Sequence, residues 1–203
     1  DALNTLLREH GVIERDAECM VSGKLVHPDT LANLSFSQLY RYTRNLAEWT
    51  MANGARLVYA SSAATYGDGE QGYSDDDAVT PSLTPMNMYG YSKHMVDLWA
   101  LRHGYFDTLV GLKFFNVYGP YEEHKGDMRS LVSKAYTEVR DTGRMRLFKS
   151  YRDEYADGEQ KRDFIYVDDA VKVVLHFLDN PHIGGLFNCG TSRATTWVEL
   201  ATA

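Results

Sequence analysis

Helix-like and strand-like patterns alternate along this chain, and that alternation constrains the fold more than any other feature. A helix is predicted over residues 34–53 and ends at Gly54, a residue type that readily adopts the left-handed backbone of helix ends. A short apolar strand is predicted directly after it, over residues 56–61. A second helix, residues 88–103, and a second strand, residues 109–115, repeat this order. Because such alternation is typical of a parallel sheet, the sequence predicts an α/β fold.

The rest of the chain carries shorter patterns. Helices are predicted over residues 2–10, 128–140 and 170–179, strands over residues 145–148 and 186–190, and a charged loop over residues 149–160. Asp168 or Asp169 is expected to cap the third of these helices. Thr196 and Glu199 form a capping box that opens one more helix.

Composition excludes several classes of protein. A chain of 203 residues is long enough for one sizeable core. The net charge of −7, without a basic stripe, argues against nucleic-acid binding. Cys19 and Cys189 are too few and too far apart for a metal-knuckle pattern, so we predict no metal site and two free thiols of a reducing compartment. No apolar run approaches the ~18 residues of a membrane span and no signal pattern is visible, which predicts a cytoplasmic protein without membrane contact.

Two sequence blocks bring reactive side chains to the ligand side of this fold. Ser61 and Ser62 end the first predicted strand, at the carboxyl end where open α/β sheets hold their ligands. Tyr89 and Lys93 follow on the next predicted helix, four residues apart and on one face, so the ammonium can act on the phenol. This arrangement indicates a redox site.

The spacing of the tyrosine and lysine is not specific by itself. With fourteen tyrosines in 203 residues, one Tyr-x-x-x-Lys match is expected by chance about half the time. Tyr121 and Lys125 show the same spacing, so only the surrounding structure can choose between the pairs. The plainer interpretation of Tyr89 and Lys93 is an amphipathic surface pair, and it is preferred for an isolated motif. The ordered neighbouring blocks reverse that preference.

The chemistry needs the paired lysine. A free phenol has a pKa near 10, so a tyrosine base that works near neutral pH needs about 3 units of lowering, or roughly 4 kcal/mol. A lysine cation and an oxidised nicotinamide could supply it together. Ser62 could hold the substrate oxygen by a hydrogen bond while Tyr89 takes its proton.

Five blocks of sequence together resemble the extended short-chain dehydrogenase/reductases, the NAD-dependent epimerase/dehydratase family of nucleotide-sugar enzymes. The blocks are ASSAATYG (60–67), YGYSK (89–93), FNVYGP (115–120), HKG (124–126) and KRDFIYV (161–167). The resemblance runs over residues 34–203 and implies a Rossmann-like, doubly wound parallel sheet with part of a smaller substrate-binding lobe. It also implies bound NADP, with NAD as the alternative.

The resemblance divides the chain into three parts. It implies a partial NAD(P)-binding Rossmann domain over residues 1–120, part of a substrate-binding lobe over 121–162, and a return to the Rossmann domain with the start of the C-terminal region over 163–203. The family's Gly-x-Gly-x-x-Gly turn and its His-x-Gly-Ala-x-Ser stretch do not appear, and Gln38 stands where the family usually has asparagine. We therefore expect a chain cut at both ends that is inactive by itself.

Carried over position by position, the resemblance implies roles for individual residues. Ser62 would polarise the substrate, Tyr89 and Lys125 would be the two acid/base groups, and Lys93 would support the tyrosine and the cofactor ribose. The implied cofactor-binding residues are Ser61, Tyr89, Lys93, Val117 and Lys125. The implied substrate-binding residues are Ser62, Asn116, Asp127, Lys134, Phe148, Lys149, Ser150, Tyr151 and Arg162. An arginine suits this set because its planar fork can grip a diphosphate.

The implied reaction is inversion at C6 of an ADP-glyceromanno-heptose, an ADP-sugar substrate, through transient oxidation and re-reduction. Two bases make chemical sense, because the oxygen meets different surroundings when hydride returns to the other face. Judged from its acidic neighbours alone, Lys125 is a solvated loop lysine, and only the resemblance gives it a role. The HKG block separates this branch from its relatives. A homo-oligomer and a role in lipopolysaccharide-core precursor synthesis are also implied.

Two other hypotheses stay open at this point. A related nucleotide-sugar 4-epimerase or dehydratase would share the serine, the tyrosine and Lys93. A non-catalytic binding or assembly protein would keep the fold without using the cofactor.

Overall fold

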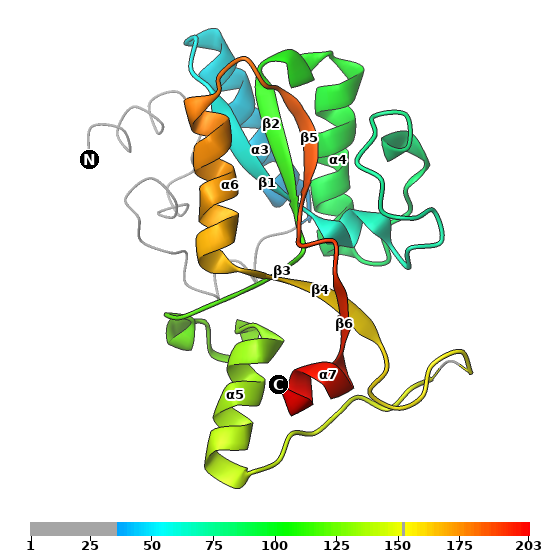
Figure 1. The fold of residues 1–203 in the computed structure, drawn as a ribbon. Coiled ribbons are helices and arrows are strands. Elements are labelled where there is room, and N and C mark those ends of the chain that lie inside the picture. Colours follow the sequence, from blue (N-terminus) through cyan, green and yellow to red (C-terminus); the bar gives the residue numbers. More distant parts are fainter. Residues whose placement is uncertain (1–35, 152) are drawn as a thin grey trace. The chain divides into compact units, whose positions relative to one another are not determined.

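The computed structural model of the chain describes residues 36–151 and 153–203 (Figure 1). The helix predicted over residues 2–10, the thiol of Cys19 and the stretch near residues 18–24 lie outside the described residues. The chain divides into two compact units. The described part of the first contains residues 36–113 and 177–187, and the second contains residues 114–176 and 188–203.

The first unit is built on a three-stranded sheet of parallel strands. The strands are β1 (Leu57–Ser62), β2 (Leu109–Phe114) and β5 (Gly185–Cys189), in the order β1-β2-β5. Helices α3 (Phe36–Ala52) and α4 (Met88–Arg102) accompany this sheet (Figure 1). The predicted alternation of helix and strand is therefore confirmed, as is the α/β class with a partial Rossmann-like sheet.

Local signals explain why α4 begins and ends where it does. The side chain of Asn87 accepts a hydrogen bond from the backbone N–H of Gly90 and caps the first turn. Gly104, with φ at 68°, follows the last turn in the left-handed conformation that glycine adopts freely. Between these ends, Val96, Trp99 and Ala100 are buried and join the core of the unit.

Arg56 joins the start of β1 to the last turn of α6 (Val167–Asp179) and to the segment that follows it. Its guanidinium donates to the backbone carbonyls of Phe177 at 2.9 Å, Pro181 at 2.6 Å and Ile183. The carbonyls at a helix C-terminus have no intrahelical partner, so the planar fork satisfies groups that burial would otherwise leave unpaired. This contact holds together residues 121 or more positions apart in the sequence.

A second three-stranded sheet, which the sequence did not predict, organises the second unit. Its strands are β3 (Asn116–Tyr118), β4 (Lys161–Tyr166) and β6 (Ala194–Thr196). β3 and β4 are parallel with Val117 opposite Ile165, and β4 and β6 are antiparallel with Arg162 opposite Thr195. Two of the strands have three residues, which is too short for a clear period in sequence.

Helices α5 (Leu131–Thr142) and α7 (Trp197–Thr202) complete the second unit. The predicted capping box of α7 is confirmed, because the Thr196 side chain accepts from Glu199 N and the Glu199 carboxylate accepts from Thr196 N. The predicted start of α5 at residue 128 is wrong by three residues. Ser130 is the cap, its hydroxyl accepting from Ser133 N at 3.2 Å, and a short 3₁₀ segment, η4 (Glu123–Met128), precedes it.

Two further predictions need correction. Asp168 and Asp169 do not cap α6, because the helix begins at Val167 and both carboxylates lie inside its first turn. Residues 145–148 form no strand, since none of the strands in the described part of the chain pairs with them, and Phe148 O accepts a hydrogen bond from Gly158 N outside any ladder. None of the helices described is long and apolar enough to cross a membrane.

Candidate active site

The first group of predicted site residues lies where β1 ends. Ser62 is the last residue of β1 and caps the short 3₁₀ helix η1 (Ala63–Tyr66), its Oγ accepting from Ala64 N at 3.1 Å. The side chain is buried and its orientation is fixed by this bond. Because Ala64 uses only one lone pair of the hydroxyl, Ser62 still has its O–H to donate.

Tyr89 and Lys93 lie in the first two turns of α4, as the sequence predicted. Tyr89 is 52% exposed, and the Lys93 ammonium lies 5.8 Å from the centre of its ring. Gly90 lets this turn approach η1, because a Cβ there would lie 2.7 Å from the carbonyl oxygen of Ala64. Because Gly90 has no side chain, η1, which follows Ser62, and α4, which carries Tyr89, can lie close together.

The half-buried Lys93 is tied to the strand that carries Ser62. Its Nζ donates to the backbone carbonyl of Ala60 at 2.9 Å. Burial lowers the pKa of Lys93, and the Asp97 carboxylate acts in the opposite direction. Asp97, fully buried one turn further along α4, accepts hydrogen bonds from Tyr59 Oη at 2.8 Å and Ser61 Oγ at 2.6 Å.

The competing pair, Tyr121 and Lys125, has a different geometry. Tyr121 is 82% exposed and its backbone is left-handed, with φ at 66°. Lys125 lies in η4, so the two residues do not share a face of an α-helix. Of the two matches, only Tyr89 and Lys93 have the helical spacing that the chemistry requires.

Lys125 has a partner of its own in the second unit. Its Nζ lies 3.5 Å from Oε2 of Glu122, a carboxylate that is almost wholly buried. Glu122 also accepts from Ser130 N at 2.7 Å, Ser130 Oγ at 2.6 Å and Gly119 N at 3.3 Å. Burial would raise the pKa of Glu122, but the hydrogen bonds from Ser130 and Gly119 and the Lys125 ammonium outweigh it and hold that pKa below its usual range.

The second sheet carries three more of the predicted residues. Asn116 and Val117 are in β3, and the Asn116 side-chain amide donates to Asp163 O at 2.9 Å. Arg162, in β4, is exposed, with its guanidinium carbon 5.9 Å from the ring centre of Trp197. Phe148 lies 5.8 Å from the same indole and is 56% exposed. Aromatic and guanidinium surfaces therefore gather around one tryptophan.

A cavity of about 410 Å³ opens beside α5 in the second unit. Two predicted substrate residues, Lys134 and Phe148, are among its lining. The other lining residues are Arg129, Leu131, Ala135, Thr137, Glu138, Met145 and Arg146. The remaining predicted residues of this unit, Asp127, Lys149, Ser150 and Tyr151, lie outside that lining, with Tyr151 94% exposed.

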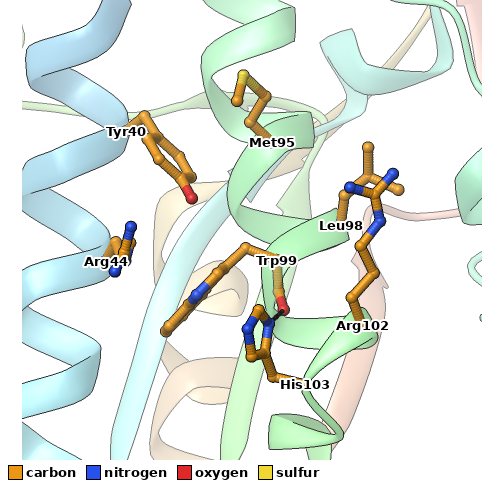
Figure 2. A pocket seen from close by; sticks show the side chains of 7 residues that line it. All are labelled: Tyr40, Arg44, Met95, Leu98, Trp99, Arg102 and His103. Carbon is orange, nitrogen blue, oxygen red and sulfur yellow. Dashed lines mark hydrogen bonds between the residues drawn. The ribbon is translucent and has the colours of Figure 1, made fainter.

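Another cavity, of about 310 Å³, lies between α3 and α4 (Figure 2). Figure 2 shows Tyr40 and Arg44 of α3 beside the ring of Trp99 on α4, and His103 Nδ1 is 2.8 Å from Trp99 O. None of the residues predicted to bind substrate or cofactor lines it.

Three buried charged residues of the site region were missed from the sequence: Asp97, Lys113 and Glu122. Asp97 could have been found, because it continues the four-residue spacing of Tyr89 and Lys93. Lys113 interrupts an otherwise apolar strand, and its Nζ lies 4.3 Å from the ring centre of Tyr66 with no hydrogen-bond partner. Glu122 gave no signal, since it is one of several acids in a charged loop.

Known proteins share much of this sequence. The chain is 53% identical over 190 residues to an ADP-L-glycero-D-manno-heptose-6-epimerase of Nitratidesulfovibrio vulgaris (strain DP4), over 94% of this chain and 54% of the relative. It is 43% identical over 180 residues to the enzyme of that name from Fusobacterium nucleatum, over 86% of this chain and 54% of the relative. The chain thus spans about half the length of these curated relatives.

Solved structures of related enzymes share the fold. ADP-L-glycero-D-manno-heptose-6-epimerase of Helicobacter pylori matches with a TM-score of 0.70 and 27% identity, over 91% of this chain and 54% of that one. dTDP-glucose 4,6-dehydratase of Bacillus anthracis matches in fold with a TM-score of 0.68 at 22% identity, over 99% and 58% of the two chains. The model of the NAD dependent epimerase/dehydratase family matches residues 30–190. The chain, with its serine, tyrosine and lysine on β1 and α4, belongs to that family.

Proposed function

We propose that the protein is a nucleotide-sugar epimerase that inverts C6 of an ADP-glyceromanno-heptose, with NADP as its redox cofactor. One observation supports the redox chemistry. Tyr89 and Lys93 form a pair on α4, next to the hydroxyl of Ser62 that caps η1. The choice of sugar is supported by the 53% identity to a relative named for that reaction.

In this proposal, side chains of the first unit bind the substrate oxygen and remove its proton. Ser62 donates its O–H to that oxygen and keeps its orientation through the bond from Ala64 N. Tyr89 takes the proton from the substrate hydroxyl as hydride leaves the carbon, and a second acid/base group serves the return of hydride to the other face. The Lys93 ammonium, 5.8 Å from the ring centre, stabilises the negative charge on the phenol oxygen during this step.

The residues described fit a nicotinamide cofactor at Lys93. An ammonium has three N–H groups, of which Ala60 O takes one, so Lys93 can also donate to ribose hydroxyls. The bound cofactor would supply hydride acceptance and return at the sugar carbon. NADP is proposed rather than NAD from the resemblance, because the 203 residues contain neither the glycine-rich turn nor the residue that selects between them.

The second unit is proposed to hold the ADP-sugar and a second proton donor. In the cavity beside α5, Arg129, Lys134 and Arg146 offer cations to a diphosphate, and Phe148 offers a ring face to a base. Lys125 is the candidate for the second acid/base, and Glu122 fixes its position through the 3.5 Å ion pair. Asn116, Asp127, Lys149, Ser150, Tyr151 and Arg162 complete the proposed substrate set, and Ser61 and Val117 the cofactor set.

A product analysis tests the reaction. The protein translated from the whole reading frame that contains these residues is incubated with NADP and an ADP-heptose of a single C6 configuration, and the sugar is followed by NMR. We expect conversion to a mixture of the two C6 epimers. Recovery of the starting epimer alone would refute the proposal.

A nucleotide-sugar 4-epimerase or dehydratase is the alternative, since Ser62, Tyr89 and Lys93 serve redox chemistry at any carbon. Lys125→Met discriminates between the two. With two bases, turnover of the ADP-heptose should fall by about 10²-fold or more, the size of a lost general acid/base. Lys172→Met, at an exposed lysine of α6, is the control and should keep full turnover. If Lys125→Met also kept full turnover, the two-base mechanism would be wrong.

The remaining alternative is a binding or assembly protein without catalysis. A fluorescence titration of the same protein with NADP separates it from the enzyme, because the epimerase requires a bound cofactor for its redox chemistry, and no binding would favour the non-catalytic protein. Homo-oligomer formation, a cytoplasmic location and a role in lipopolysaccharide-core precursor synthesis are carried over from the resemblance as parts of the same proposal.

A further inference from the structure

One line of side chains along α4 extends the site into the core. Tyr89, Lys93 and Asp97 follow one another at intervals of four residues, so phenol, ammonium and carboxylate lie on one face of the helix in that order. Exposure falls along the line, from 52% at Tyr89 to 0% at Asp97. Lys93 therefore lies between the exposed phenol of Tyr89 and the buried carboxylate of Asp97 on this face of the helix.

The same face of α4 holds three consecutive residues of β1. The Tyr59 hydroxyl and the Ser61 hydroxyl donate to the two oxygens of Asp97, and between them the Ala60 carbonyl accepts from Lys93. The next residue of the strand is Ser62. Asp97 and Lys93 therefore fix the strand end that carries the proposed oxyanion donor against the helix that carries the proposed base.

The buried carboxylate is surrounded by a defined set of charges. Lys93 lies on its own helix, Lys113 on β2, and Lys113 is itself influenced by Asp75 and Asp77 of the loop after η1. Burial raises the pKa of Asp97 to about 6, although the bonds from Ser61 and Tyr59 and the charges of Lys113 and Lys93 lower it.

His94, also on α4, does not take part in that set as a cation. Burial and the charges of Lys113 and Arg102 lower its pKa to about 4, so it is neutral near pH 7.

We propose that Asp97 is a positioning residue of the redox site: its buried negative charge keeps Lys93 protonated and in place, and so sets the alkaline limit of catalysis. Asp97 touches neither substrate nor the reacting atoms and acts through Lys93. Its catalytic consequence rests on the proposed function, but its effect on Lys93 does not.

The negative charge of Asp97 can affect the catalytic rate through Lys93 alone. A half-buried ammonium loses its proton more readily than an exposed one, and a carboxylate one helical turn away opposes that loss. Once Lys93 is neutral, the phenol of Tyr89 has no adjacent positive charge and its action as a base is weakened. Removing the Asp97 charge should therefore move the loss of activity to lower pH without changing any group that contacts the sugar.

Asp97→Asn tests this, because it removes the charge and keeps nearly the same shape. In protein labelled with ¹³C at the lysine ε carbon, the Lys93 signal, assigned by its absence in Lys93→Arg, is titrated. We expect its midpoint to fall by about one unit or more, the effect of losing a nearby opposite charge. The pH at which kcat falls on the alkaline side of its pH profile should decrease by the same amount. An unchanged midpoint, or lower activity without that decrease, would overturn the proposal.

Tyr59→Phe is the matched control, since it removes one hydrogen bond to Asp97 and leaves the charge. In Tyr59→Phe, the midpoint of the Lys93 titration at alkaline pH should match that of the unaltered protein. A fall as large as that in Asp97→Asn would assign the effect to packing and refute the proposal.

The unaltered protein supplies a second test that does not depend on Asp97→Asn. Its Lys93 signal should show a further inflection near pH 6, where Asp97 titrates, and Tyr59→Phe should move that inflection upward. Absence of the inflection would contradict the coupling. The titrations need no sugar, so a protein that fails to invert ADP-heptose would refute the proposed function and still decide this one.

Discussion

At the scale of single residues, the two units place carboxylates next to lysines in opposite ways. Asp97 is buried deeply enough for its pKa to rise, whereas Glu122 receives three hydrogen bonds and its pKa falls. Both acids act on a lysine that the resemblance marks as functional, Lys93 in one case and Lys125 in the other. The lysines were visible in the sequence motifs. Spacing could have placed Asp97 on the helix face of Lys93, but the burial of both carboxylates depends on packing that spacing does not report.

Glu122→Gln tests the residue that fixes the Lys125 loop. The charge-assisted bonds from Ser130 and the ion pair to Lys125 would be lost or weakened, at a cost of about 1.5–3 kcal/mol in the free energy of unfolding. Because the folded-state pKa of Glu122 is lowered, its stabilisation is present above the unfolded pKa of about 4.3 and is lost as the pH falls through the folded value. Denaturant unfolding should therefore show the full difference at pH 7 and a smaller one below pH 4.

The neighbouring residue provides the comparison for this variant. Glu123 is exposed and differs from Glu122 by one position in the same loop. Glu123→Gln should change stability by less than about 0.5 kcal/mol. Equal effects of the two substitutions would show that the buried bonds of Glu122 contribute nothing specific.

At the scale of elements, the helices and strands of the first unit and the helices of the second were largely predictable, but the strands of the second were not. The first-unit helices are long and each is followed by a glycine, and its strands have five or six residues in apolar runs. α3, α4, β1, β2 and β5 therefore appear within about two residues of their predicted bounds. In the second unit, β3 and β6 have three residues each and exist because they pair with β4. The predicted strand over residues 145–148 has apolar residues but no partner, and pairing decides whether such a run becomes a strand.

The contact between α4 and η1 can be tested at Gly90. In Gly90→Ala, the new Cβ would start 2.7 Å from Ala64 O and 2.9 Å from Pro85 Cβ, so the two elements must separate. We expect a loss of about 1–3 kcal/mol in stability, as for other overpacked sites. A larger fall in kcat than in substrate affinity should accompany it, because Ser62 and Tyr89 move apart.

Gly54→Ala separates this effect from backbone strain. Gly54 has φ at 64°, and a Cβ there meets nothing within 4 Å, so the substitution costs backbone strain alone. It should lower stability by about 1 kcal/mol and leave kcat unchanged. Wild-type kcat in Gly90→Ala would show that the close approach is unrelated to the site.

At the scale of the whole molecule, the net charge has the same sign as the proposed ligands. The chain carries a net charge of −7, and the proposed ADP-sugar and NADP are both anions. The composition argued against nucleic acid as a partner, but it could not show where the local cations lie. The structure gathers Arg129, Lys134 and Arg146 around one cavity, and this clustering depends on the placement of α5 against residues 145–148.

Two charge-reversing substitutions distinguish the effect of the cations beside the cavity from the effect of the net charge. Lys134→Glu and Lys172→Glu each replace a positive by a negative charge, so they lower the net charge equally. Lys134 lines the cavity beside α5, whereas Lys172 is an exposed residue of α6 whose ammonium lies 2.8 Å from Asp169. Isothermal titration with ADP at ~0.1 M salt should show affinity lost by about tenfold or more in Lys134→Glu, because a charge close to a phosphate is worth over 1 kcal/mol. Lys172→Glu should change it less than twofold, since exposed charges beyond a Debye length of about 10 Å are screened. Equal losses would mean that net charge alone governs binding and that this cavity does not hold the diphosphate.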